Sequence, residues 1–433
     1  MWHSVQAFLK SWGIVIALTL VGVFVAFRYV APPPPDTLRF AVSREAGSAY
    51  TAAVDAYARG VEAERFRVER VPSAGSAENL RLLRAGRVDM ALVQGGVAGA
   101  ADAPGTESAS GLVSLGAVFL EPAWVFVRRA EGEGNPVQRL RGRRVAVGPE
   151  GSGTRILALA LLTANGLGGD AIQALPITGA EAAEALLNGG ADAAILVSAA
   201  PTEAILRLVR AEGVDLLNFG SRADAYAAQL RYLTPARLPR SGLSLPDDLP
   251  RDDIMLMAPS ASLLARGDLN PQVAALMMRI LRDTHKGRTL FSPEGRFPNG
   301  TGTEIPLQEE AKNFYERGES FLQRYLPFWL AVAVDRLWVL IIPLLTLLLP
   351  LARIAPAVYT WQMERKLTRI YGEVRKVEEG AGKGLSVQTQ ARLESLEKEA
   401  AKLDLPDSYA DRIYQLRRHI TWLKDGHVEP IRA

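Results

Sequence analysis

The sequence lacks cysteine altogether, and its 433 residues include only four histidines. Without cysteine the chain has no thiol nucleophile, no disulfide and no cysteine-ligated metal site. The histidines are not spaced as metal ligands, so neither a catalytic metal nor a cofactor is indicated. They are His3, His285, His419 and His427. No nucleophile with a neighbouring base is visible either, which makes an enzyme the weakest interpretation.

The sequence also has little excess charge, because 50 Lys and Arg residues nearly balance 47 Asp and Glu residues and leave a net charge of +3. This balance does not suggest a nucleic-acid partner. A lysine is missing from the turn "GPEGSGT", where Gly148 and Gly153 have the spacing of a P-loop. Since that lysine would have to reach the outer phosphates, we do not expect a nucleotide site.

What the turn does offer is a set of backbone N–H groups and hydroxyls at the start of a helical pattern. These groups belong to Gly151, Ser152, Gly153 and Thr154. Free N–H groups at a helix N-terminus bind a carboxylate or a similar small anion. Serine and threonine are also ordinary N-caps, so a purely structural role for the turn stays open.

Two long apolar runs indicate a membrane protein. The first predicts a transmembrane anchor over residues 12–30, with a cleavable signal peptide as the alternative. The second, rich in leucine and bordered by tryptophan, predicts a transmembrane helix region over residues 328–355. A buried core helix is the alternative for the second run.

The distribution of basic residues sets the expected orientation. A basic cluster follows the second run and, by the positive-inside rule, places the tail, residues 356–433, in the cytoplasm. With two spans the N-terminus, residues 1–11, is cytoplasmic too, and the middle of the chain lies outside. A proline-rich spacer, residues 31–37, holds the next domain off the bilayer.

Between the runs, strand-like and helix-like segments alternate over residues 38–325, which predicts βαβ units and a mainly parallel sheet covered by helices. Two segments repeat at an offset of 103 residues, so that Leu83, Gly86 and Asp89 match Leu186, Gly189 and Asp192. We expect two similar lobes, about 38–120 with 250–325 and about 128–240, and a ligand cleft between them. A chance recurrence of helix, glycine cap and strand is the alternative.

Several segments, in their order and spacing, resemble the TAXI family, the solute receptors of one class of tripartite ATP-independent periplasmic (TRAP) transporters. They are "AGSAYTAAVDAYARG", "VPSAGSAENLRLLRAGRVDMALVQ", "VFLEPAWVFVR", "GPEGSGTRILALALLTANGL" and "GGADAAILVSAAPTEAIL". The resemblance implies a two-lobed α/β periplasmic-binding-protein fold, type II like and NMT1/TAXI-like. It covers roughly residues 38–325 and is similar to the longer, membrane-anchored subgroup.

The resemblance also implies a pocket that closes on a small organic solute. Carried over to this chain, the pocket residues are Gly47, Tyr50, Gly75, Ser76, Asn79, Gln94, Glu121, Gly151, Ser152, Gly153 and Thr154. The chain departs from the family where Gly95 and Gly96 follow Gln94 in place of a Gln-x-Asp motif, and in "AGSAYTAA". Both departures fall on expected pocket walls, so the solute is not identified.

Physical chemistry adds a requirement to this pocket. Ser76 is expected to cap one helix, as Ser152 or Thr154 caps another, so that two N-termini face one cleft. Each terminus contributes about 0.3–1 kcal/mol, whereas micromolar binding needs about 8 kcal/mol. We therefore expect a cation, Arg44 or Arg155, or an aromatic wall, Tyr50 or Trp124, to contribute. Equally open are an exposed Arg155 and core positions for both aromatic residues.

Glu121 and Pro122 lie between two strand-like halves, where a two-lobed chain would cross between lobes. A hinge or a pocket acid at Glu121 competes with a plain bulge at the proline. In the tail, helical patterns carry single apolar stripes, Leu393, Leu396, Ala400 and Leu403 in one and Ile413, Leu416, Ile420 and Leu423 in the next. A helical hairpin, a partner-docking surface or a self-packed bundle would bury them.

Together these features predict a non-catalytic receptor in a bacterial inner membrane, with its binding domain in the periplasm. Its expected partners are a small organic anion or amino acid, TRAP-type permease subunits and the lipid bilayer. A transmembrane sensor, in which cleft closure outside alters the tail inside, is the main alternative. Binding measurements and the identity of a membrane partner would separate the two.

Overall fold

The chain divides into two compact units, Pro34–Val332 and Met1–Pro33 with Ala333–Ala433. The structure is a computed structural model. It describes residues 34–44, 48–101, 111–129, 135, 137–319, 330, 360–361, 363–380, 386–403 and 409–425.

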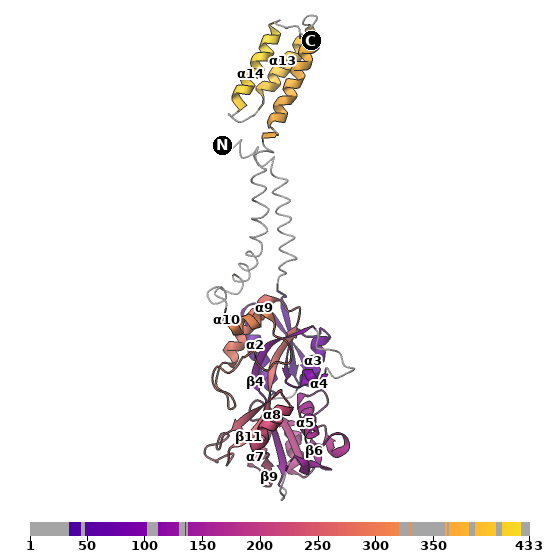
Figure 1. Ribbon diagram of the computed structural model, residues 1–433, viewed down its shortest axis with the longest axis vertical. Coiled ribbons are helices and arrows are strands. Elements are labelled where there is room, and N and C mark those ends of the chain that lie inside the picture. Colours follow the sequence, from indigo (N-terminus) through magenta and orange to yellow (C-terminus); the bar gives the residue numbers. More distant parts are fainter. Residues whose placement is uncertain are drawn as a thin grey trace. The chain divides into compact units, whose positions relative to one another are not determined.

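The first unit, Pro34–Val332, alternates strands and helices as the sequence pattern predicts (Figure 1). Its strands are β1 (Thr37–Ser43), β2 (Arg67–Ser73), β3 (Met90–Gln94), β4 (Leu112–Leu120), β5 (Ala123–Arg128), β6 (Arg144–Ala146), β7 (Gln173–Leu175), β8 (Ala193–Val197), β9 (Val214–Leu216), β10 (Leu233–Leu238) and β11 (Ile254–Arg266). Its α-helices are α2 (Ala49–Ala63), α3 (Ser76–Arg84), α4 (Val97–Ala101), α5 (Gly153–Ala164), α6 (Gly179–Leu187), α7 (Glu203–Arg210), α8 (Ala223–Gln229), α9 (Pro271–His285) and α10 (Glu309–Arg317).

The strands form two lobes, each built on a parallel core with antiparallel additions. In the first lobe β2, β1 and β3 run parallel, and the second half of β11 pairs antiparallel with β3 and β4. In the second lobe β7, β6 and β8 run parallel, and β5 pairs antiparallel with β8 and β9. The first half of β11 pairs with β10. The expected two-lobed α/β fold is therefore present.

The chain crosses between the lobes at two neighbouring places. Glu121 and Pro122 connect β4 of the first lobe to β5 of the second, as predicted. The other crossing lies inside β11, where pairing with β10 ends at Pro259 and pairing with β4 begins at Ser260. The Glu121 backbone N–H donates to the Pro259 carbonyl at 2.9 Å. One hydrogen bond thus joins the two crossings.

The sequence repeat corresponds to a structural repeat. Asp89 pairs with Arg39 at 2.6 Å in the first lobe, and Asp192 pairs with Arg144 at 3.0 Å in the second. Each aspartate also accepts the backbone N–H of its arginine at 2.9 Å. These pairs hold the start of β3 against β1 and the start of β8 against β6.

The glycines of the repeat occupy equivalent positions as well. Gly86 has a φ of 64° and Gly189 a φ of 77°, a region that L-residues with a side chain rarely adopt. A Cβ at Gly86 would lie 2.7 Å from Nη1 of Arg266, and one at Gly189 would lie 2.7 Å from Nη1 of Arg128. The recurrence therefore reflects two similar lobes rather than chance.

Apolar side chains fill the interior of each lobe. In the first, α2 buries a stripe that includes Val54, Tyr57 and Val61 against the sheet and α9. In the second, α5 buries Leu157 and Leu161 on one side of the sheet, and α6 and α7 pack together on another core. Because α2, α5, α6 and α7 are packed on these cores, the positions of their N-terminal ends are fixed.

The tail forms a self-packed helical bundle. Helices α13 (Val387–Ala401) and α14 (Ala410–Lys424) pack with helical residues 363–380. The predicted stripes supply their core, which contains Leu393, Leu396, Ala400, Leu416, Ile420 and Leu423 together with Ile370 and Val374. Ile413 is only partly buried. The self-packed bundle is thus the alternative that the structure shows.

Across the described ranges, no helix combines the length and the apolar composition that crossing a bilayer requires. The two predicted transmembrane segments, 12–30 and 328–355, lie outside the described residues except for residue 330. The N-terminus, 1–11, and residues 31–33 of the spacer lie outside them as well. These segments and the orientation inferred from them stay predictions.

Candidate functional site

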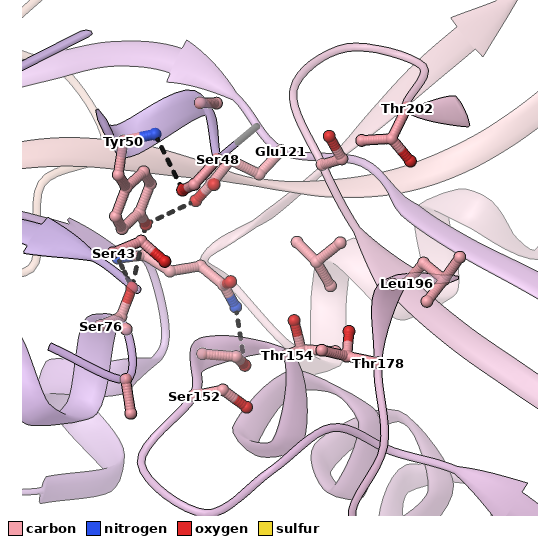
Figure 2. A pocket seen from close by; sticks show the side chains of 18 of the residues that line it. Ser43, Ser48, Tyr50, Ser76, Glu121, Ser152, Thr154, Thr178, Leu196 and Thr202 are labelled. Carbon is pink, nitrogen blue, oxygen red and sulfur yellow. Dashed lines mark hydrogen bonds between the residues drawn. The ribbon is translucent and has the colours of Figure 1, made fainter. Parts of the chain in front are cut away.

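A polar pocket of about 100 Å³ lies between the two lobes (Figure 2). The first lobe and its crossing contribute Ser43, Ser48, Ala49, Tyr50, Ala74, Gly75, Ser76, Gln94 and Glu121. The second lobe contributes Ser152, Gly153, Thr154, Thr178, Gly179, Leu196, Val197, Ser198, Thr202 and Ile205. The cleft expected between similar lobes is therefore present.

Five helices begin at this pocket. The N-cap residues of α2, α3, α5, α6 and α7 all line it, and they are Ser48, Gly75, Ser152, Thr178 and Thr202. The first backbone N–H groups of each helix have no carbonyl partner within the helix. Together with the helix dipoles they make this region favourable for negative charge.

The helix ends differ in how far the chain itself satisfies them. Ser48, Ser152 and Thr202 accept backbone N–H groups of their own helices through their side chains. Thr178 makes no such capping bond, so the first turn of α6 is not capped by its side chain. The Thr154 hydroxyl makes no hydrogen bond within the described part of the chain. Gly75 provides no side-chain cap for α3 either, so Thr154 and the starts of α3 and α6 are the groups most available to a ligand.

Glu121 anchors a hydrogen-bonded chain on the first-lobe side of the pocket. The Tyr50 hydroxyl donates to Oε2 of Glu121 at 2.8 Å and lies 2.9 Å from Oγ of Ser76. Because Tyr50 has a single hydroxyl proton, Ser76 donates to Tyr50. Oγ of Ser76 in turn accepts the Gln94 backbone N–H at 3.1 Å. Figure 2 shows Tyr50 with Glu121 and Ser76 beside it.

The prediction that Ser76 caps its helix is wrong. Gly75 is the N-cap of α3, with a φ of 129°, and no side chain caps that helix end. The Ser76 hydroxyl instead ties the start of α3 to the end of β3 through Gln94. The Ser76 hydroxyl is therefore already bonded within the protein, although Ser76 lines the pocket.

Burial changes the acidity of both titratable side chains in the lining. Burial raises the pKa of Glu121 to about 7, against the opposing effect of the Tyr50 hydrogen bond. Burial, followed by the nearby Glu121 charge, raises the pKa of Tyr50 well above its usual range. The described lining contains no basic residue. Glu121 is thus a buried carboxyl group without a cation beside it.

The lobes touch directly where α3 and α5 begin. Nε2 of Gln94 donates to the Gly153 carbonyl at 3.1 Å, and the Glu78 backbone N–H donates to the Gly151 carbonyl at 3.3 Å. A Cβ at Gly153 would lie 2.7 Å from Oε1 of Gln94. A residue larger than glycine at this position would therefore displace the Gln94 amide and disturb its hydrogen bond to the second lobe.

Eight of the residues predicted from the sequence line this pocket. They are Tyr50, Gly75, Ser76, Gln94, Glu121, Ser152, Gly153 and Thr154. Gly47 lies outside the described residues. Gly151 contacts the first lobe through its carbonyl but does not line the pocket.

The structure places three other predicted residues away from the pocket. Asn79 is fully buried and bonds to Ser73 and to the Leu92 carbonyl, so it joins α3 to the sheet. Trp124 is also fully buried, in the second-lobe core, where its indole N–H donates to the Ser198 carbonyl. Arg155 donates to the Gly148 carbonyl.

The expected cation is absent from the described lining. Arg44 is 61% exposed and pairs with Glu78 at 3.7 Å, and Arg155 does not line the pocket either. Of the two aromatic candidates, only Tyr50 lines it. The physical reason is that both arginines find partners on their own lobe, outside the cleft.

Sequence reasoning missed most of the second-lobe lining. Thr178, Gly179, Ser198 and Thr202 all lie where a strand ends or a helix begins. The segments "ITGAEAAEALL" and "SAAPTEAIL" carry the same N-cap signal as the glycine-rich turn. Applying that signal to every helix start after a strand would have found them.

A larger chamber of about 1120 Å³ adjoins the polar pocket. Ala49, Thr178, Gly179, Ser198 and Thr202 line both spaces. The walls of the chamber are mainly apolar and come from α2, β4 and the starts of α6 and α7, with Leu290 and Phe297 at one side. The outermost lining includes the exposed side chains of Glu203 and Arg288.

Over the described ranges no three His, Cys, Asp or Glu side chains gather as a metal site requires. The geometry of the pocket instead suits reversible capture of a small polar molecule, because hydrogen-bonding groups converge on it from two lobes.

This chain is similar to several solved structures and to one protein family. A protein from Bordetella bronchiseptica RB50 shares 15% identity, with 65% of this chain and 98% of that chain covered and a TM-score of 0.45. The periplasmic aliphatic sulphonate binding protein of Escherichia coli shares 19% identity over 58% of this chain and 73% of its own, with a TM-score of 0.36. A histidine kinase sensor domain with similarity to periplasmic binding proteins shares 16% identity over 58% and 90%, also with a TM-score of 0.36. The model of the NMT1-like family matches residues 48–286, and since this is more than half of the sequence, the chain belongs to the NMT1-like family.

Proposed function

We propose that this chain is a membrane-anchored extracytoplasmic receptor that captures a small organic anion or amino acid between its lobes. The observation that carries the proposal is the polar pocket, where five helices of two lobes begin. The resemblance to TAXI proteins supports delivery of the solute to a TRAP-type permease. The predicted transmembrane segments would hold the receptor at the inner membrane, with the pocket in the periplasm.

The number of helix ends bears on the affinity. Two ends contribute too little, but five ends at about 0.3–2 kcal/mol each reach several kcal/mol. Charge-assisted hydrogen bonds from free hydroxyls and N–H groups add about 1.5–3 kcal/mol apiece. Micromolar binding, about 8 kcal/mol net, is then within reach without a cation in the described lining.

The test is isothermal titration calorimetry of the full chain, purified in detergent, against a panel of organic acids and amino acids. We expect one class of solute to bind with micromolar affinity or better. Thr154→Val, which removes a hydroxyl from the lining, should weaken binding about tenfold. Thr163→Val, at an exposed position of the same helix, is the matched control. If no small solute binds, the receptor function is wrong.

The packed tail favours a second candidate function, a transmembrane sensor. The bundle around Leu396 and Leu416 has its own core, and Trp361 and Tyr414 are exposed on it, which a partner could contact. Crosslinking in membranes separates the candidates. A permease crosslinked independently of solute supports transport, whereas solute-dependent crosslinking of the tail to a cytoplasmic protein supports sensing.

A further inference from the structure

Resting on the proposed function, we infer that the solute is an amino acid with an apolar side chain, its amine bound by Glu121 and its carboxylate by the helix ends of the second lobe. This goes beyond a small organic anion in naming both charges of the head group. It also assigns the large chamber to the side chain.

Glu121 is the reason to place an amine in the pocket. Its side chain is 5% exposed, and its Oε2 accepts the Tyr50 hydroxyl at 2.8 Å. No hydrogen bond of Oε1 is recorded within the described part of the chain, although Glu121 lines the pocket. A ligand ammonium group supplies the donors and the opposite charge that this carboxylate lacks.

The alternative, a solute with negative charge alone, fits this arrangement poorly. Glu121 and Tyr50 are the only titratable groups in the described lining, and neither is a cation. An anion beside an ionised Glu121 would place two negative charges in a cavity of about 100 Å³. A zwitterion avoids this repulsion, because its amine lies between its own carboxylate and Glu121.

The two charges have separate places on the two walls. Glu121 and Tyr50 lie on the first-lobe side, whereas Thr154 and Thr178 lie across the pocket (Figure 2). The first turn of α6, which lacks a side-chain cap, and the free Thr154 hydroxyl offer donors to a carboxylate. A head group with amine and carboxylate on one carbon has the size and the polarity for this cavity.

The rest of the solute must extend into the adjoining chamber. The polar pocket, at about 100 Å³, has little room beyond the head group, whereas the chamber is about 1120 Å³. Beyond the residues shared with the pocket, the buried side chains of Ala53, Val118 and Phe119 line the chamber. Glu203 and Arg288 belong to its exposed outer part. An apolar side chain therefore meets apolar atoms where it leaves the pocket.

The experiment compares four probes by calorimetry on the full chain in detergent. The probes are L-leucine, its 2-hydroxy analogue without the amine, isoamylamine without the carboxylate, and L-glutamate. We expect leucine to bind at least about tenfold more tightly than each of the others. The comparison uses wild-type protein, so it decides the question even if a variant does not fold.

A pair of variants then tests the role of Glu121. Glu121→Gln should weaken leucine binding at least tenfold. It should also reduce the difference in affinity between leucine and its 2-hydroxy analogue. Glu62→Gln, at an exposed position in the last turn of α2, should leave both affinities unchanged. A thermal melt checks that both variants fold.

The outcomes distinguish this inference from the receptor function. If the 2-hydroxy acid binds as tightly as leucine and Glu121→Gln changes neither, the amine assignment is wrong while the receptor function stands. If glutamate binds more tightly than leucine, the assignment of an apolar side chain is wrong. If nothing in the wider panel binds, both the inference and the receptor function fail.

Discussion

Replacing Glu121 by glutamine should make the unliganded protein more stable at alkaline pH. Burial raises the pKa of Glu121 from an ordinary 4.5 to about 7. Since one pKa unit corresponds to about 1.4 kcal/mol, ionising this buried carboxyl group in the folded protein costs about 3 kcal/mol. Glutamine has nearly the same shape and does not titrate, so the variant does not carry this cost.

The sign of the pH dependence follows from linkage. A carboxyl group with a raised folded-state pKa contributes most to stability below its unfolded pKa, and the contribution is lost as pH rises through the folded pKa. The wild type should therefore lose stability relative to Glu121→Gln between pH 4.5 and 7 and stay lower above pH 7. The difference between the two proteins should change by up to about 3 kcal/mol across this window.

The assay is urea unfolding of both full-length proteins at several pH values from 4.5 to 8, followed by near-ultraviolet circular dichroism. Using the difference removes contributions that both proteins share. His285 is one of them, because burial lowers its pKa to about 4 and both proteins lose stability as pH falls from 6.5 toward 4. A difference that is constant with pH would refute the reasoning, since Glu121 would then not titrate in a buried site. A difference of the opposite slope would refute it as well.

Three further predictions concern other parts of the chain. Thr154→Val should weaken solute binding about tenfold with little change in the melting temperature, because its hydroxyl has no bond in the described protein; an equal loss of both would indicate a structural role. Gly86→Ala and Gly189→Ala should each destabilise the fold by about 1–2 kcal/mol in urea unfolding, owing to positive φ; a neutral result at either would contradict the structural repeat. A reporter fused after Ala433 should be active only in the cytoplasm and one inserted near Gly105 only outside, and activity on the same side would overturn the topology.

Local sequence signals predicted much of the fold, whereas the resemblance to TAXI proteins supplied the predicted pocket residues, eight of which line the pocket. The alternation of strands and helices, the repeat of Gly86 and Gly189 and the crossing at Glu121 all depend on neighbours in sequence. Each of these signals involves residues close together in the chain, so it can be recognised in a single sequence. Ser152 shows this clearly, because it caps α5 as its position before the helical pattern indicates.

Side-chain direction was the part that the sequence did not determine. Asn79 and Trp124 lie near pocket residues in the sequence, but both point into packed interiors. Ser76 begins its helix as expected, yet its hydroxyl bonds to the neighbouring strand at Gln94 instead of capping. These outcomes depend on which face of each element meets the core, and that is set by contacts between segments distant in sequence.

The error about charge has a different origin. Sequence reasoning sought a cation, since two helix ends alone bind an anion weakly. The structure instead brings five helix ends together and adds a carboxyl group, Glu121, without a described cation beside it. Neither the number of ends nor the sign of the charge could be read from a chain whose overall charge is nearly balanced.

A buried carboxyl group without a positive partner lowers the stability of the fold. In a binding site, the same group can strengthen the binding of a positively charged ligand. Among the described residues that line the pocket Glu121 has no positive partner, and its ionisation opposes the fold. A solute with an amine removes that cost on binding, so the same interaction that destabilises the empty pocket favours an amine over a hydroxyl. Stability gained and affinity lost in Glu121→Gln therefore have one physical cause. They should appear together in one variant and be absent together in Glu62→Gln, whose carboxyl group is exposed.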